Sequence, residues 1–236
     1  MTRLDSFLTP IEIEALALSL RVSFWAMVWS LPAGVAVAWL LARAEFPGRT
    51  LVDVVIHLPL VLPPVVVGYL LLLLLGTQGP LGALLQDWFG VTVAFTWKGA
   101  AVAAAVMAFP LMVRAIRLSF EAVDRRLEAA ARTLGAGPVT VFATITLPLI
   151  LPGILTGLVL GFARALGEFG ATITFVSNIP GETRTLPVAL YSLTQTPGAE
   201  GAALRIMIIS VVLAFAALAG SEFLARRIRA RSGAAL

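Results

Sequence analysis

The sequence predicts an all-α integral membrane protein with about five transmembrane helices, its N-terminus outside the membrane and its C-terminus inside. Of its 236 residues, 59% are apolar and only 13% are charged, whereas soluble domains carry about 25% charged residues. The mean hydropathy is +0.97. Too few polar side chains remain to cover a soluble protein, and a soluble enzyme is therefore excluded.

Five stretches are long and apolar enough to cross a bilayer, which takes about 20 residues per helix. We expect them at about 22–42, 51–75, 99–113, 147–176 and 203–225. The third is short unless its ends extend, and the fourth is long enough to tilt or break. Several contain proline, which is tolerated where neighbouring helices satisfy the freed backbone groups.

The distribution of arginine sets the orientation, because basic residues concentrate in cytoplasmic segments. An odd number of spans places the two termini on opposite sides. With the C-terminus inside, the segments outside the cytosol hold few basic residues, namely Arg3, Lys98, Arg184 and Arg205. The inner segments hold many more, namely Arg43, Arg49, Arg114, Arg117, Arg125, Arg126, Arg132, Arg226, Arg227, Arg229 and Arg231. A nucleic-acid-binding face is the alternative explanation of the basic balance, but it requires a solvated basic surface.

Sites built from cysteine or from several histidines are excluded, because the chain has no cysteine and one histidine, His57. Asp53 precedes His57 by one helical turn, which leaves open a proton relay or a packed histidine. The carboxylates suggest no catalytic pair.

The longest inner loop, about 114–146, contains a predicted short helix. Asp124 is a suitable N-cap, Gly135 suits a left-handed C-terminal position, and Pro138 prevents continuation. Leu127, Ala130, Ala131 and Leu134 share one face. Such a helix either packs on its own membrane domain or docks to a cytosolic partner.

The same loop resembles the coupling segment of binding-protein-dependent ABC importer permeases, whose pattern is EAA, a glycine, nine residues and I-x-L-P. Gly135 is followed at that spacing by Ile145, Thr146, Leu147 and Pro148. The spacing from Glu128 to Gly135 is one residue longer than usual, so either Glu128 sits one place early or Ala129 takes the acidic position. The resemblance implies one permease domain at 1–236 with ATPase-coupling residues Asp124, Leu127, Glu128, Ala129, Ala130, Ala131, Leu134 and Gly135.

Two further segments, ARALGEFGATITF (163–175) and SNIPGETRTLPVALYSLTQTPG (177–198), resemble oxyanion importer permeases, the second most of all those for molybdate. The resemblance implies import of molybdate across the inner membrane by alternating access, with sulfate, thiosulfate or tungstate as alternatives. Two alternatives come from other classes of protein. A membrane-embedded lipid-modifying enzyme would need a polar catalytic cluster, which this sequence does not offer, and a passive channel would not need a docking helix.

Active import needs an energy source, and a phosphate-binding loop requires Gly-Lys-Ser/Thr. The one lysine, Lys98, lies in a Trp-Lys-Gly sequence on the outer side. ATP and magnesium are therefore expected on a separate cytosolic ATPase, with no cofactor and no metal bound by this chain. The resemblance implies two copies of the chain, two ATPase subunits and an external molybdate-binding protein, surrounded by membrane lipid and without nucleic acid.

Charged residues near the fourth span are candidates for the transport pathway. Arg164 and Glu168 stand four residues apart and can pair on one helix face, either lining the pathway or bracing the helices. Arg184, flanked by two threonines in the outer loop, either meets the oxyanion, contacts the binding protein or caps its loop.

Overall fold

The computed structural model describes residues 8–233, and it is helical with no strand in that range. Arg3, which the orientation count included, lies outside the described residues, as do the side chains of Arg226, Arg227, Arg229 and Arg231. In chain order the elements are α1 (Pro10–Arg43), α2 (Arg49–Val61), α3 (Pro64–Leu75), α4 (Pro80–Phe89), α5 (Trp97–Ala122), α6 (Arg125–Thr133), α7 (Pro138–Val141), the π-helical turn η2 (Phe142–Thr146), α8 (Leu147–Leu166), α9 (Gly170–Val176), α10 (Leu186–Thr194) and α11 (Glu200–Gly233).

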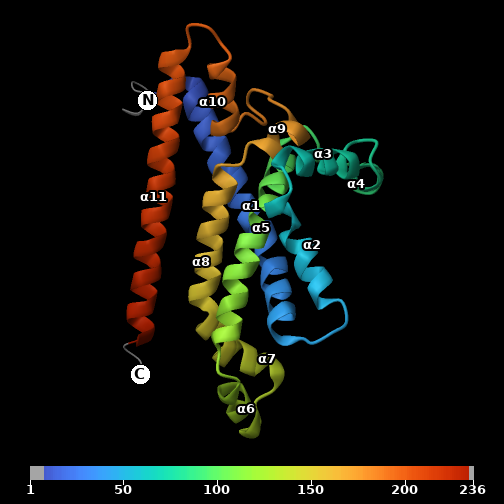
Figure 1. Ribbon diagram of the computed structural model, residues 1–236, viewed down its shortest axis with the longest axis vertical. Coiled ribbons are helices and arrows are strands. Elements are labelled where there is room, and N and C mark those ends of the chain that lie inside the picture. The colour runs from blue at the N-terminus through green and yellow to red at the C-terminus, as the bar shows by residue number, and fades with distance from the viewer. Residues whose placement is uncertain (1–7, 234–236) are drawn as a thin grey trace.

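The long helices run roughly parallel to one axis, and the short ones gather at its two ends (Figure 1). α1 begins at the upper end and α11 finishes toward the lower end, as an odd number of crossings requires. α9 and α10 lie near the upper end, and α6 and α7 extend beyond the long helices at the lower end. We call the lower end the α6 end; it is the end that the arginine distribution places in the cytosol.

α5 forms the centre of the bundle and packs against α1 and α8. One face of its outer half is built of alanines that are fully buried, namely Ala100, Ala101, Ala103, Ala104 and Ala108. Its inner half contributes Met112, Ile116 and Phe120 to a second buried cluster with Leu41 of α1 and Ile150 of α8. Small side chains at the contact let helices approach closely within a membrane.

Within the described residues, four helices are long and apolar enough to span a membrane: α1, α5, the continuous helix of α7, η2 and α8 at Pro138–Leu166, and α11 up to Gly220. The number rises to five if α2 and α3 count together, in agreement with the sequence prediction. These two helices are bent by 115° at Leu62–Pro63, so the second span, expected at 51–75, is divided into two helices at its prolines. Pro63 and Pro64 lack the backbone donors that would continue α2.

The ends of the other spans also differ from the prediction. The third extends to Ala122, so Arg114 and Arg117 belong to α5 rather than to the loop. The fourth begins at Pro138 and breaks after Leu166, where Gly167 to Phe169 separate α8 from α9. Both outer loops contain a helix that the periodicity did not indicate, α4 and α10, each beginning with a proline in its first turn.

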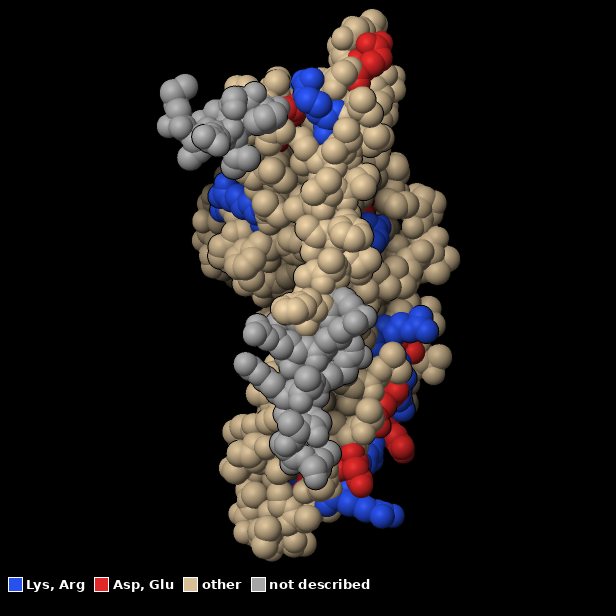
Figure 2. Space-filling view, turned by 90° about the vertical axis from the view of Figure 1, so that its left-hand side faces the viewer, with Lys and Arg blue, Asp and Glu red and all other residues tan. Residues whose placement is uncertain are grey.

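Much of the surface is apolar. Figure 2 shows a largely uncharged face, with charged side chains in small groups over the upper half and along one edge of the lower half. α2 buries none of its side chains, and the apolar window of α11 is only 6% buried. Exposed leucine and valine side chains on these helices suit contact with lipid or with another protein within the bilayer.

Gly153 tests the central contact between α5 and α8. A Cβ atom at this position would collide with the Ser119 side chain. We expect Gly153→Ala to lower the thermal unfolding midpoint of the purified protein, since overpacking costs about 1–3 kcal/mol.

Two controls sharpen this test. Gly201→Ala on α11 meets no atom of the described residues within 4 Å and should leave the midpoint unchanged. Adding Ser119→Gly should recover part of the loss, because it removes the colliding atoms. Equal midpoints for Gly153→Ala and the wild type would contradict this account of the packing.

Candidate functional site

α6 is the predicted short helix, and its ends are those that the sequence indicates. The Asp124 carboxylate accepts a hydrogen bond from the Arg126 backbone N–H at 2.9 Å, as an N-cap does. Gly135 has a φ of +86°, the left-handed conformation that ends a helix. Pro138 then begins α7, so the chain turns between the two helices. The helix predicted between Asp124 and Gly135 is confirmed.

The two faces of α6 have different surroundings. Leu127 and Leu134 are 49% and 88% exposed, and Ala130 between them is exposed as well. The opposite face carries Glu128 and Ala129 and lies toward the inner end of α1. Leucine side chains that a short charged helix exposes to solvent are typical of a surface that contacts another protein.

Glu128 joins three elements at one point. Its Oε1 atom accepts a hydrogen bond from Arg43 Nη2 at the end of α1, at 2.9 Å, and another from Thr146 Oγ1 of η2, at 2.7 Å. The side chains of Arg43 and Glu128 are only 11% and 15% exposed. The acidic residue of this segment therefore holds α6 to α1 and to the helix that continues into α8. Ala129 makes no polar side-chain contact and cannot replace it.

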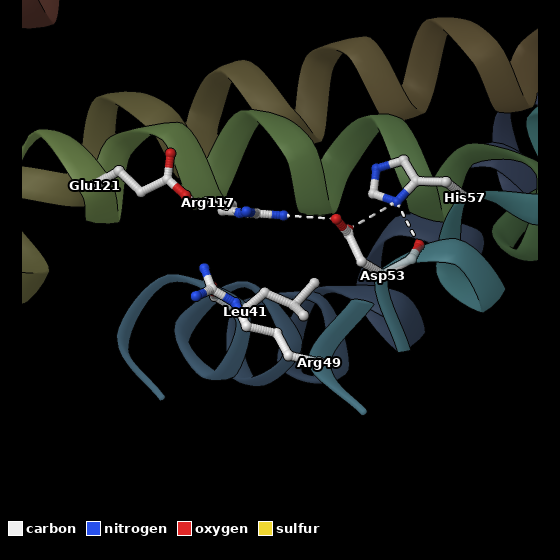
Figure 3. Close-up of polar contacts among 6 residues, drawn as sticks. All are labelled: Leu41, Arg49, Asp53, His57, Arg117 and Glu121. Carbon is white, nitrogen blue, oxygen red and sulfur yellow. Dashed lines mark hydrogen bonds and ion pairs between the residues drawn. The ribbon is translucent and has the colours of Figure 1, made fainter. Parts of the chain in front are cut away.

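A second charged cluster connects α2 to α5 (Figure 3). Asp53 Oδ2 accepts a hydrogen bond from Arg117 Nη1 at 3.1 Å, and Arg117 Nε donates to Glu121 at 2.8 Å. His57 Nδ1 lies 3.2 Å from Asp53 Oδ1 and 2.9 Å from the Asp53 carbonyl oxygen. His57 thus packs within a chain of ion pairs that attaches α2, a helix with no buried side chain, to the bundle.

Arg164 and Glu168 form the ion pair that their spacing predicts, with Nη1 2.6 Å from Oε2. The other carboxylate oxygen of Glu168 accepts a hydrogen bond from the Ala171 backbone N–H at 2.8 Å, in the first turn of α9. The Glu168 side chain is 2% exposed and that of Arg164 is 27% exposed. The pair braces the break between α8 and α9, and the guanidinium keeps partial access to the surroundings.

Arg184 is tied into its own loop. Its Nε donates to Asn178 Oδ1 at 2.8 Å, and Asn178 Nδ2 donates to Ser192 Oγ of α10 at 2.7 Å. The neighbouring Thr183 hydroxyl donates to the Ser177 carbonyl oxygen and accepts from the Ile179 N–H. These contacts order the segment between α9 and α10.

Sequence reasoning missed the partners that lie far away along the chain. It did not connect Arg43 or Thr146 with Glu128, although the pattern contains Thr146 itself. It also missed Arg205 of α11, whose Nε lies 2.8 Å from Glu12 Oε1 of α1. The sequence could have indicated only a local pair, Arg117 and Glu121, which stand one helical turn apart, the spacing of an ion pair on one helix.

Comparison with known proteins places this arrangement in a family. Residues 30–230 match the family model described as binding-protein-dependent transport system inner membrane component. The molybdenum transport system permease protein ModB of Escherichia coli K12 is 65% identical over 226 residues, which cover 96% of this chain and 99% of that protein. ModB of Haemophilus influenzae is 59% identical over 222 residues, covering 94% and 97%.

A solved structure agrees at the level of the fold. The crystal structure of a bacterial alginate ABC transporter, in complex with a periplasmic protein bound to an alginate pentasaccharide, matches 94% of this chain and 81% of its own chain. The TM-score is 0.73 at 21% identity. With several apolar helices and a family match over most of its length, the chain belongs to the binding-protein-dependent transport system inner membrane components and is a multi-pass inner-membrane protein.

Proposed function

We propose that the chain is the membrane-spanning subunit of an ABC importer for molybdate. It moves the oxyanion by alternating access, and a separate cytosolic subunit binds ATP and magnesium and hydrolyses the ATP. The observation that carries the proposal is the position and surface of α6. This polar helix extends beyond the long helices at the cytosolic end, and its exposed leucines suit contact with a soluble partner. Extensive identity to permeases named for molybdenum transport supports the substrate.

The proposed assembly contains two copies of this chain, two ATPase subunits and one external binding protein, within membrane lipid. Four or five spans are few to enclose a pathway. The sparsely buried faces of α2 and α11 leave apolar surface for a second copy or for lipid. The chain itself serves as the transport subunit and not as the enzyme, and it binds no cofactor of its own.

The proposed coupling site uses both faces of α6. Leu127, Ala130, Ala131 and Leu134 enter a groove on the ATPase, and the small alanines let the helix sit deeply. Glu128 passes the displacement of α6 to Arg43 and Thr146, and so to α1 and α8. Asp124 and Gly135 define the ends of the helix, and Ala129 completes its inner face.

For the pathway we propose that Arg164 and Glu168 hold the junction of α8 and α9 beside the moving oxyanion. The partial exposure of Arg164 leaves its charge available to a divalent anion. Arg184 acts at the outer side by ordering the loop that faces the binding protein. Sulfate, thiosulfate and tungstate remain alternative substrates of the same chemical class.

The function is tested by reconstituting the chain with its ATPase in liposomes and measuring ATP hydrolysis. Binding proteins loaded with molybdate, tungstate or sulfate are supplied in turn. We expect the molybdate-loaded protein to stimulate hydrolysis most, with unloaded binding protein as the control. Equal stimulation by all three would refute the choice of molybdate, and failure to assemble with any ATPase would refute the role as a permease subunit.

Leu134→Glu tests the docking face. Leu134 follows α6 directly, so the substitution leaves the helix intact while it places a charge on an apolar contact. We expect the ATPase to bind at least roughly tenfold more weakly in a pull-down titration, as anchor residues at interfaces cost about 2 kcal/mol or more. Thr133→Glu adds the same charge on another face and should weaken binding less. If the Leu134→Glu variant binds the ATPase with wild-type affinity, this face of α6 is not the docking site.

Glu128→Gln tests transmission separately from docking. The ATPase should still bind, because Glu128 lies on the opposite face, but molybdate uptake per ATP hydrolysed should fall severalfold to roughly tenfold. Arg43→Gln removes the same ion pair from the other side and should have a similar effect. If both variants transport with unchanged coupling, the contact is only structural.

A further inference from the structure

A groove of about 880 Å³ lies between the inner end of α1 and the inner face of α6. Its α1 wall carries Pro32, Val35, Ala36 and Trp39 at helical spacing and ends at Arg43. α6 and the start of the next helix form the other wall, with Arg125, Glu128 and Arg132 among the lining residues. The docking face of α6 points away from this groove.

The charges in the groove do not cancel. Glu128 is paired with Arg43. Arg125 and Arg132, one on each side of Glu128 along α6, line the same groove and have no ion-pair partner among the side chains that the structure describes. Three guanidinium groups and one carboxylate thus line the groove, and two positive charges remain for a ligand. Arginine favours phosphate, to which it can donate two parallel hydrogen bonds.

The apolar and charged parts of the groove follow each other at the depths of the acyl chains and headgroups of one membrane leaflet. Pro32 and Arg43 are eleven residues apart on α1, which corresponds to roughly 16 Å along the helix. Half of a hydrocarbon core of about 30 Å has the same depth. Trp39, 48% exposed, lies one turn before Arg43, at the level where aromatic residues sit near lipid headgroups. The apolar wall therefore ends where the arginines begin.

From this arrangement we propose that the groove binds an anionic phospholipid of the cytoplasmic leaflet. Its phosphate lies between Arg125 and Arg132, and an acyl chain lies along Val35, Ala36 and Trp39. Basic pockets on the cytoplasmic side of transmembrane helices are suited to such headgroups. A soluble ATPase is a poorer occupant, because the α1 wall belongs to a membrane-spanning helix. The bound lipid would support α6 from the face opposite the ATPase.

Lipid retention by the intact complex tests the headgroup contact. The complex is extracted, exchanged into equal amounts of phosphatidylglycerol and phosphatidylcholine, and analysed by native mass spectrometry. We expect preferential retention of phosphatidylglycerol, and a roughly tenfold to thirtyfold weaker preference in the Arg125→Gln/Arg132→Gln variant. Arg126→Gln removes the same charge from the same helix outside the groove and should keep the wild-type preference. No preference in the wild type, or equal loss in Arg126→Gln, overturns the proposal.

Trp39 reports on the acyl chain independently of the arginine variants. Phosphatidylglycerol with brominated acyl chains should quench tryptophan fluorescence more than brominated phosphatidylcholine, and Trp39→Phe should abolish the difference. Inorganic phosphate, compared with sodium chloride at equal ionic strength, should not restore the fluorescence. Displacement by phosphate would indicate a free-anion site, equal quenching by both lipids would indicate contact with lipid of any headgroup, and no quenching by either lipid would indicate a groove closed by a second copy; each of these results refutes the site for an anionic lipid. Neither measurement depends on the transported substrate.

Discussion

The close contact between α5 and the helices beside it determines where every other element can lie. α8 presents Gly153, Gly157 and Gly161 along one face, and these glycines meet Ser119, Met112 and Met27. No side chain larger than hydrogen fits at the first of them without movement of α5. Because lipid supplies no hydrophobic force between helices, this close packing has to supply much of the attraction. The contact faces of α5 and α8 are therefore rich in alanine and glycine, and the two largest fully buried side chains, Phe120 of α5 and Phe175 of α9, lie toward opposite ends of the bundle.

Charged pairs have a complementary role, since they join elements that the core does not hold firmly. α2 buries no side chain but is connected to α5 through Asp53 and Arg117. α11 meets α1 through Arg205 and Glu12, whose carboxylate also closes the capping box at the start of α1. α6 is connected through Glu128. In a molecule with few charges, ion pairs at such joints give direction to contacts that apolar packing leaves unspecified.

The sequence predicts the elements of this structure much better than their relations. Apolar length located the long helices, and local chemistry defined α6 through Asp124 and Gly135. Pro63 indicated a possible break in the second span, but it did not predict the angle between α2 and α3. That angle depends on how α3 packs on α9 at Gly68. The partners of Glu128 could not be predicted, since Arg43 lies 85 residues away and helix periodicity contains no information on which ends meet. The Gly-x-x-x-Gly repeat of α8 was a readable signal of the central contact, but hydropathy averages hide it.

The proposed coupling between α6 and the membrane helices needs a connection that transmits a push on α6 and still lets the helices change their relative positions. The π-helical turn at Phe142–Thr146 lies between α7 and α8, and Thr146 within it bonds to Glu128. π-Helical turns are weaker than α-helix and are frequent where helices change their shape. A push on α6 would reach α8 through Thr146 and α1 through Arg43, at a point where the backbone can change its winding. In the proposed coupling, the contacts of Glu128 with Arg43 and with Thr146 of the π-helical turn make it the point from which α6 would move two membrane helices together.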